Sequence, residues 1–124
     1  MSKSEPIRKL YLIFKGTCEM SNELDAPKVE VTKFNFEIST PPSTNKNTKN
    51  GQLVHGWFKP GELNYFSLGT HEVKKDGEQA NFKIEKNHEK LKGQKTVAFR
   101  YDLENADGSE RHKSTAVTVA NPGS

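Results

Sequence analysis

The stretch Lys-Thr-Val-Ala-Phe-Arg-Tyr-Asp-Leu, at Lys95–Leu103, decides the fold class of this chain. Large apolar side chains alternate in it with small or polar ones, in the order Val97, Ala98, Phe99, Arg100, Tyr101, Asp102 and Leu103. Because successive side chains of a strand point to opposite faces, this alternation predicts a β-strand with one buried face and one solvated face. We expect its apolar face to cover a hydrophobic core.

Shorter runs of the same kind recur on both sides of this strand. The sequence predicts further strands at 7–15, 28–39, 53–59, 81–85 and 113–120. Three stretches stay open. Residues 62–68 are either a short strand or a single helical turn that ends at Gly69, and residues 70–75 are ambiguous. Residues 86–95 are either a loop or a short helix. Short strands separated by turn signals predict an all-β domain with at most one short helix. We expect a small β-barrel or sandwich of six to eight mostly antiparallel strands.

The segment 28–39 carries apolar side chains on both strand parities. Val29 and Val31 share one parity, whereas Phe34, Phe36 and Ile38 share the other. A strand of period two cannot bury both sets on one face without a shift. The pattern predicts a β-bulge or a sharp bend near residues 32–33. Alternatively, the two halves of the strand serve two different sheets.

Composition limits the kind of protein. The chain has 124 residues, of which 31% are hydrophobic and 28% charged, so we expect one domain over residues 1–124 with a thin core. Seven Phe, three Tyr and one Trp argue against disorder. No apolar run reaches the roughly 18 residues of a membrane span, and no signal-peptide pattern is visible. We therefore expect a soluble protein without a membrane span or an export signal.

Charge and cysteine content exclude further classes. The single cysteine, Cys18, excludes an internal disulfide and a cysteine-based zinc site within one chain. The net charge of +3 comes from interspersed acidic and basic residues rather than from a basic face, so we expect no nucleic-acid partner.

No residue pattern in the chain indicates catalysis. The four histidines have no metal-ligand spacing, namely His55, His71, His88 and His112. The carboxylates stand mostly beside lysines, and there is neither a glycine-rich phosphate loop nor a nucleophile elbow. We therefore expect a protein that is not an enzyme, with no catalytic residue, no metal and no cofactor.

Four aromatic residues surround the turn signal Pro60-Gly61, and they are Trp57, Phe58, Tyr65 and Phe66. Such rings either pack in the core or form a platform that stacks on sugars or bases. In the second case the chain is a monomeric β-sandwich binding module for a glycan, a lipid headgroup or a protein.

The longest unpatterned stretch covers about residues 40–52 and is rich in Pro, Ser, Thr, Asn and Lys. Pro41 and Pro42 end the preceding strand, and no apolar side chain anchors the rest. Unstructured loops of about 12 residues are usually either functional or mobile, and both alternatives stay open here. A short flexible tail is expected after residue 120.

Both parts of the chain that flank this middle region share a pattern with one family. The opening strand is Leu-Tyr-Leu-Ile-Phe-Lys-Gly at Leu10–Gly16, and the next is Val-Glu-Val-Thr-Lys-Phe-Asn-Phe-Glu-Ile at Val29–Ile38. The closing part has the strand Val97–Tyr101, the turn Asp107–Ser109 and the strand Lys113–Val119. These stretches resemble the haemolysin-coregulated protein family, Hcp, which forms the tube of the bacterial type VI secretion system. The family's α-helix after the third strand has only Lys59–Leu63 in its place.

The resemblance implies a structural protein that assembles into rings, usually hexamers, which stack into a tube. Its partners would be further copies of itself and the spike, sheath and cargo proteins of the secretion system. Such a protein is located in the bacterial cytoplasm before assembly and is secreted by a system that does not depend on a signal peptide. By position, the family's ring-stacking loop corresponds to Ser43–Gly51, which assigns interface residues Lys46, Asn47, Lys49, Asn50 and Gly51.

Overall fold

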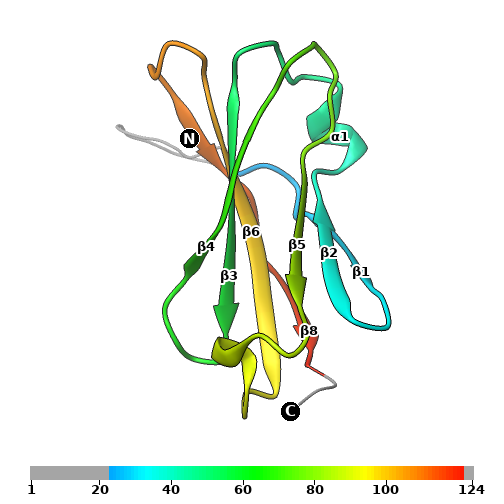
Figure 1. Ribbon diagram of the computed structural model, residues 1–124. Coiled ribbons are helices and arrows are strands. Elements are labelled where there is room, and N and C mark those ends of the chain that lie inside the picture. Colours follow the sequence, from blue (N-terminus) through cyan, green and yellow to red (C-terminus); the bar gives the residue numbers. More distant parts are fainter. Residues whose placement is uncertain (1–22, 122–124) are drawn as a thin grey trace, which may run out of the picture.

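A computed structural model of the chain describes residues 23–121, which form two antiparallel sheets packed face to face (Figure 1). Eight strands lie in this part of the chain, with one four-residue helical turn, α1, at Pro42–Asn45 and one 3-10 turn, η3, at Glu89–Leu91. The predicted all-β class is confirmed. The sheets are not closed into a barrel in the described range, so the fold is the sandwich of the two predicted forms. Within 23–121 no helix has the length and apolar character needed to cross a membrane.

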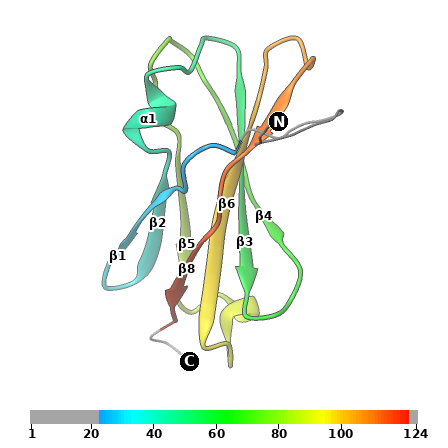
Figure 2. The same cartoon turned by 180° about the vertical axis from the view of Figure 1, so that it is seen from behind.

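The smaller sheet has three strands in the order β1-β2-β5, with bounds Lys28–Val31, Asn35–Ser39 and Asn81–Glu85. The larger sheet has β4 (Phe66–Glu72) at one edge, followed by β3 (Leu53–Pro60) and β6 (Thr96–Glu104). The other side of β6 pairs with two short strands in succession, β7 (Arg111–Lys113) and β8 (Val117–Ala120). Figure 2 shows this arrangement from behind.

The core lies between the two sheets because each contributes its apolar face. Phe36 of β2 and Phe99 of β6 are fully buried, and their ring centroids are 5.6 Å apart. One buried cluster fills the end of the sandwich near η3, with members Phe36, Ile38, Phe58, Ile84, Leu91, Val97 and Phe99. A second fills the other end, with members Val54, Val73, Ala80, Tyr101 and Leu103. The half-buried Phe82 packs against both and joins them.

Gly56 of β3 makes room for the Phe82 ring. A Cβ atom at Gly56 would lie 3.0 Å from three carbon atoms of that ring, which is closer than side chains normally approach. The glycine therefore allows the aromatic ring to lie directly on the strand backbone. The same strand has a β-bulge after Gly56, where its pairing with β4 shifts register.

The prediction of one strand over 28–39 is wrong. The chain reverses completely at residues 32–34, and β1 and β2 pair as an antiparallel hairpin within one sheet. Val29 lies opposite Ile38, and Val31 opposite Phe36. Because directly opposed residues share a face, the hairpin brings both parities of the sequence to the same side of the sheet. Neither a bulge within one strand nor a strand shared by two sheets is present.

Two other strand boundaries differ from expectation. β4 continues through Gly69, whose φ of 117° lies in the region open to glycine, so this residue does not end the strand. The last predicted strand is divided into β7 and β8, because its regular pairing with β6 is interrupted at residues 114–116, where Ser114 bonds to Tyr101 and forms an isolated parallel bridge with Leu24. The predicted strand at 7–15 and Cys18 lie outside the described residues.

Candidate functional site

The outer face of the larger sheet carries a continuous group of polar and aromatic side chains. Residues of β3 alternate strictly between the core and this face, because Val54, Gly56, Phe58 and Pro60 point inward. We call the outer face the side chains on the other side of β3, β4, β6 and β7, together with Tyr65 immediately before β4. Its members are His55, Trp57, Lys59, Tyr65, Thr70, Arg100, Asp102, Glu104 and Arg111. The pairing of Trp57 with Arg100 and of His55 with Asp102 aligns these side chains across neighbouring strands.

Asp102 is the centre of this group. Its side chain is only 5% exposed although it stands on the solvent side of the sheet, because its neighbours cover it. One carboxylate oxygen accepts a hydrogen bond of 2.6 Å from Arg100. The other accepts bonds of 3.2 Å from the Trp57 indole N–H and 3.2 Å from Nε of Arg111. A carboxylate with two cationic donors and an indole donor is well satisfied for a buried charge.

Arg100 lies between two aromatic rings. Its guanidinium carbon is 5.6 Å from the Trp57 ring centroid and 4.8 Å from the Tyr65 ring centroid. The Lys59 ammonium is 5.9 Å from the Tyr65 centroid. Cation–π contacts of this kind, together with the ion pair to Asp102, hold the two rings in fixed positions on the sheet.

A second set of contacts continues the group along the sheet. Nε2 of His55 donates to Glu104 across 2.8 Å, and its Nδ1 lies 3.1 Å from the Thr70 hydroxyl. Arg111 also approaches Glu104, at 4.0 Å. The outer face is thus a connected network rather than a set of independent solvated side chains.

The four aromatic residues predicted as one cluster divide between the two faces of the sheet. Phe58 is buried and packs on Phe66 with 5.7 Å between ring centroids, so these two rings belong to the core. Trp57 and Tyr65 are half-buried and stand on the outer face. The neighbours that hold them there, Arg100 and Asp102, were not selected from the sequence as site residues. The alternation of Lys95–Leu103 places both on the polar side of a strand, but only the pairing of β6 with β3 brings them to Trp57.

Each of the four histidines forms a hydrogen bond with another residue. His55 binds Glu104, His71 binds Glu78, His112 binds Glu110, and His88 accepts a bond from the Lys90 backbone N–H. Among residues 23–121 no group of three or more His, Cys, Asp or Glu side chains is arranged to hold a metal ion.

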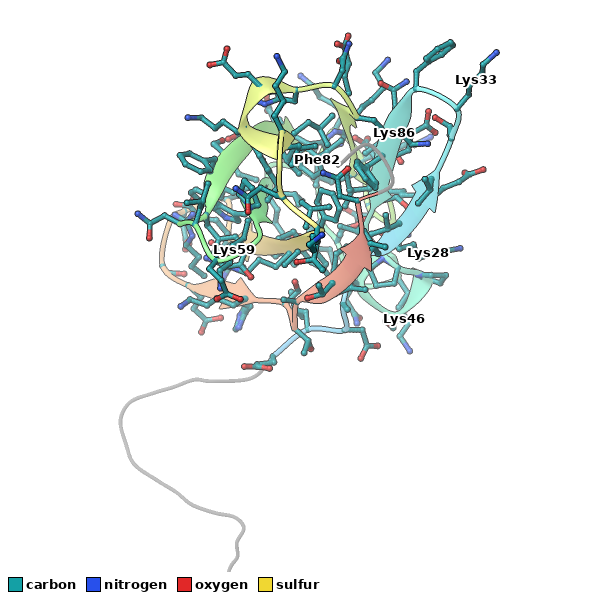
Figure 3. The ribbon with its side chains drawn as sticks, turned by 90° about the horizontal axis from the view of Figure 1, so that it is seen from below. Lys28, Lys33, Lys46, Lys59, Phe82 and Lys86 are labelled. Atoms are coloured by element: carbon teal, nitrogen blue, oxygen red, sulfur yellow. The ribbon has the colours of Figure 1, made fainter. Side chains whose placement is uncertain are left out.

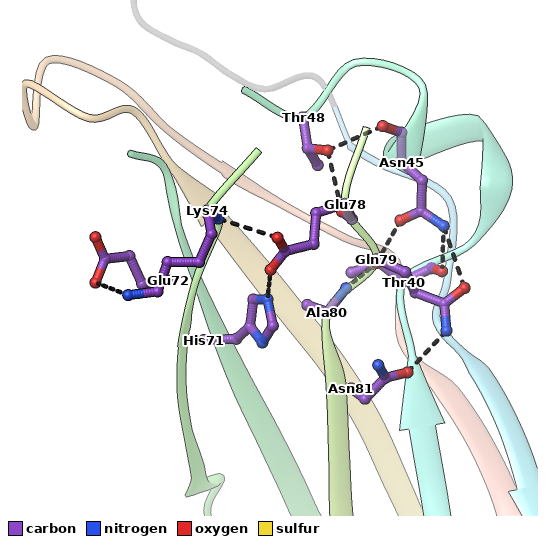
Figure 4. Close-up of polar contacts among 10 residues, drawn as sticks. All are labelled: Thr40, Asn45, Thr48, His71, Glu72, Lys74, Glu78, Gln79, Ala80 and Asn81. Atoms are coloured by element: carbon purple, nitrogen blue, oxygen red, sulfur yellow. Dashed lines mark hydrogen bonds and ion pairs between the residues drawn. The ribbon is translucent and has the colours of Figure 1, made fainter. Parts of the chain in front are cut away.

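The segment 40–52 is anchored by buried threonines rather than by apolar residues. Thr40, Thr44 and Thr48 are at most 3% exposed. The Thr40 backbone and side chain both bond to Ala80, and the Thr48 hydroxyl lies 3.0 Å from the Glu78 carbonyl oxygen (Figure 4). This polar packing ties the segment to the 73–80 connection.

The residues assigned to ring stacking lie along this segment. Lys46, Asn47, Lys49 and Asn50 are exposed, and Gly51 is half-buried. Lys49 is 4.0 Å from Asp76, the Asn50 backbone N–H donates to the same carboxylate, and Gly51 N–H donates to the Val73 carbonyl. The structure thus fixes the backbone of 49–51 and leaves the side chains of Lys46 and Asn47 at the surface.

His71 and Glu78 connect β4 to the same region. The Glu78 carboxylate accepts a 2.6 Å bond from His71 Nε2 and a 3.1 Å bond from the Lys74 backbone N–H. The His71 hydrogen bond, more than any other contact, holds the pKa of Glu78 below its usual value of 4.5. A lowered folded-state pKa adds stability above the unfolded-state pKa, and this stability is lost as the pH falls through the folded-state pKa.

We therefore expect Glu78→Gln to lower the melting temperature at neutral pH and to change it progressively less below pH 4.5. Thermal unfolding of wild type and variant over an acidic pH series measures this difference. Glu72→Gln, which removes an exposed carboxylate of the adjacent strand, is the matched control and should change the melting temperature little at any pH. A Glu78→Gln effect that is the same at all pH values would contradict the assignment.

The smaller sheet has a cavity of about 570 Å³ lined by residues of all three strands and by Gln79. Its polar lining includes Lys28, Glu30, Glu37, Asn81 and Lys83. A second cavity of about 450 Å³ shares Lys83 and continues along the same sheet toward the β1–β2 turn. These two hollows offer hydrogen-bonding groups rather than a deep apolar pocket.

Comparison with known proteins assigns the chain to no family. The chain matches no protein-family model, no curated protein and no solved structure. The resemblance to Hcp therefore stays a prediction from the sequence.

Proposed function

We propose that the chain is a non-enzymatic structural subunit that associates with further copies of itself through the outer face of the larger sheet. The observation that carries this proposal is the stack of Trp57, Arg100 and Tyr65 fixed by the buried carboxylate of Asp102. Trp, Tyr and Arg dominate the binding energy of protein interfaces. In this chain all three stand side by side on the solvent side of a sheet.

The fixed positions of the Trp57, Arg100 and Tyr65 side chains favour binding to another protein. Long side chains such as arginine lose rotamer freedom when an interface forms, and that loss weakens binding. Here the Arg100 side chain is already only 20% exposed, and its guanidinium is held by an ion pair and two rings. The entropic cost of ordering it on binding is correspondingly small.

The open edges of the sheets favour a second copy as the partner. Within residues 23–121, β1, β4 and β5 each pair with a neighbour on one side only. Unpaired edges are templates for strand pairing between chains, and identical edges can pair across a two-fold axis. The resemblance to the ring-forming Hcp family supports the same choice. Because the described sheets form no barrel, a ring of this chain would be built through faces and edges of the sandwich.

Substitution of Trp57 tests this proposal. We expect Trp57→Ala to abolish or strongly weaken self-association measured by sedimentation velocity, while thermal unfolding still reports a cooperative fold. Phe34→Ala, which removes an exposed ring from the β1–β2 turn, is the control and should leave association unchanged. Unchanged association of Trp57→Ala, with a folded protein, would show that the outer face is not the interface.

A second candidate function is a monomeric module that binds a glycan, and the cavity on the smaller sheet favours it. Carboxylate, amide and ammonium groups line this hollow, and they are suitable partners for sugar hydroxyls. Screening of the monomer against immobilised oligosaccharides tests this candidate. Binding should be lost in Glu37→Ala and retained in Trp57→Ala, whereas the absence of any bound glycan would remove the candidate.

A further inference from the structure

We propose that one end of the sandwich docks on a bilayer surface that contains anionic phospholipids. We call this end the loop end and define it by three connections: residues 32–34, 61–65 and 86–95. The loop end shares Tyr65 with the Trp57–Arg100–Tyr65 stack, but its exposed apolar side chains and its lysines lie outside that stack, so the proposal does not depend on the self-association proposed above.

Strand pairing places the three connections together. β2 begins where β5 ends, because Asn35 pairs with Glu85, so the β1–β2 turn lies beside residue 86. β6 begins where β3 ends, because Pro60 pairs with Val97. The connection 86–95 therefore joins both sheets at the same end, which is the lower end in Figure 1.

Exposed apolar side chains are concentrated at this end. The large hydrophobic residues with high exposure in the described range are Phe34 at 68%, Val31 at 48% and Leu63 at 46%. Phe34 and Leu63 lie in two of the three connections, and Val31 is the last residue of β1. Apolar side chains at loop tips can enter the boundary between lipid headgroups and acyl chains.

Positive charge is concentrated at the same end. Its three connections hold five lysines, Lys33, Lys86, Lys90, Lys92 and Lys95, against two acidic residues, Glu62 and Glu89. The connections at the opposite end, 40–52, 73–80 and 105–110, hold four lysines and four acidic residues. Figure 3 views the molecule from below, with Lys33 and Lys86 labelled beside the β1–β2 turn. Among these six connections, the excess of positive charge therefore lies at the loop end.

Backbone contacts fix the β1–β2 turn in this position. The Lys86 N–H donates to the Phe34 carbonyl oxygen across 2.8 Å, and the Lys86 ammonium lies 3.4 Å from the Lys33 carbonyl oxygen. The Lys90 ammonium lies 4.3 Å from the Phe66 ring centroid, which keeps the 3-10 turn against β4. The apolar tip and the adjacent lysines are thus presented together.

The residue types favour lipid over nucleic acid as the anionic partner. All five cations of the loop end are lysines, which act as point charges, whereas phosphate recognition in nucleic acids commonly uses the planar fork of arginine. These lysines lie on loops around exposed apolar side chains. Proteins that bind single-stranded nucleic acid instead use a basic groove lined by aromatic rings on which the bases stack. Lysines near a membrane are attracted to anionic headgroups while an apolar tip inserts between them.

Flotation with lipid vesicles tests the proposal on the full chain. We expect binding to vesicles of phosphatidylserine and phosphatidylcholine, no binding to phosphatidylcholine alone, and weaker binding as salt is raised. Phe34→Ala should weaken binding about tenfold. The double variant Lys92→Gln/Lys95→Gln should weaken it about twentyfold. The matched control Lys46→Gln/Lys75→Gln removes two lysines from the opposite end and should bind like wild type.

Four results would overturn the proposal. The first is no binding to phosphatidylserine vesicles at low salt. The second is equal loss in both double-lysine variants, which would indicate attraction by net charge alone. The third is a combination of two observations: Phe34→Ala leaves vesicle binding unchanged, and the chain binds single-stranded DNA as tightly as it binds the vesicles. This combination would indicate a surface that binds any polyanion. Loss of binding in Trp57→Ala would instead assign the contact to the outer face and would also count against the loop end.

Discussion

Phe99→Ala is expected to lower the free energy of unfolding by about 3–5 kcal/mol. Phe99 is 0% exposed, stands on the central strand β6 and packs against Phe36 of the opposite sheet. Removing the ring leaves a cavity between the sheets that the surrounding side chains can fill only in part. Because small domains are stable by about 5–15 kcal/mol in total, this single change removes a large part of the stability. Urea unfolding of the two proteins measures the difference.

Phe34→Ala is the matched control, because the same atoms are removed from a ring that is 68% exposed. We expect it to change the free energy of unfolding by no more than about 0.5 kcal/mol. Equal effects of the two substitutions would contradict the assignment of the core to the space between the sheets.

Tyr101→Phe is expected to lower the free energy of unfolding by about 1–3 kcal/mol. The buried Tyr101 hydroxyl donates to the Asp25 carbonyl oxygen across 2.8 Å and lies 2.6 Å from the Thr44 hydroxyl. It therefore ties both α1 and the chain before β1 to the central strand. The variant keeps the ring but leaves the Thr44 hydroxyl without this partner. Tyr65→Phe, which removes the hydroxyl of a half-buried ring on the outer face, is the control and should change the free energy of unfolding little.

Alkaline pH gives an independent check on Tyr101. Burial raises its pKa from 10.0 to about 12, with the hydrogen bond from Thr44 opposing the shift and the charge of Asp25 adding to it. A raised folded-state pKa means that the stability from the neutral phenol is complete below pH 10 and is lost as the pH rises through about 12. We expect the stability difference between wild type and Tyr101→Phe to shrink over this range. A difference that is constant up to pH 12 would contradict the burial of the hydroxyl.

Period-two alternation was sufficient to predict the strands at 53–59, 81–85 and 95–103, because each buries one face against the opposite sheet. It was not sufficient for 28–39. The change of parity there has two physical causes that the pattern alone does not distinguish, a bulge or a reversal. The reversal occurs at Thr32-Lys33-Phe34, which has no Gly or Pro to mark a turn. The hydroxyl of Thr32 instead bonds to the backbone of Asn35.

The candidate site was only partly predictable for a similar reason. The sequence places Trp57 and Phe58 next to each other, and alternation requires them to occupy opposite faces, yet it does not say which one is buried. The register of β3 against β6 decides this, because it brings Arg100 and Asp102 beside Trp57. Register depends on contacts between residues far apart in the chain. The packing of segment 40–52 also depends on distant residues, because its buried threonines form hydrogen bonds with residues about 30 or more positions away in the sequence.

Sedimentation velocity of the wild-type chain over a wide range of concentration tests the central claim most directly. We expect species heavier than the 14.0 kDa chain, and we expect their proportion to rise with concentration. A single 14.0 kDa species at every concentration, including the highest that can be reached, would contradict self-association.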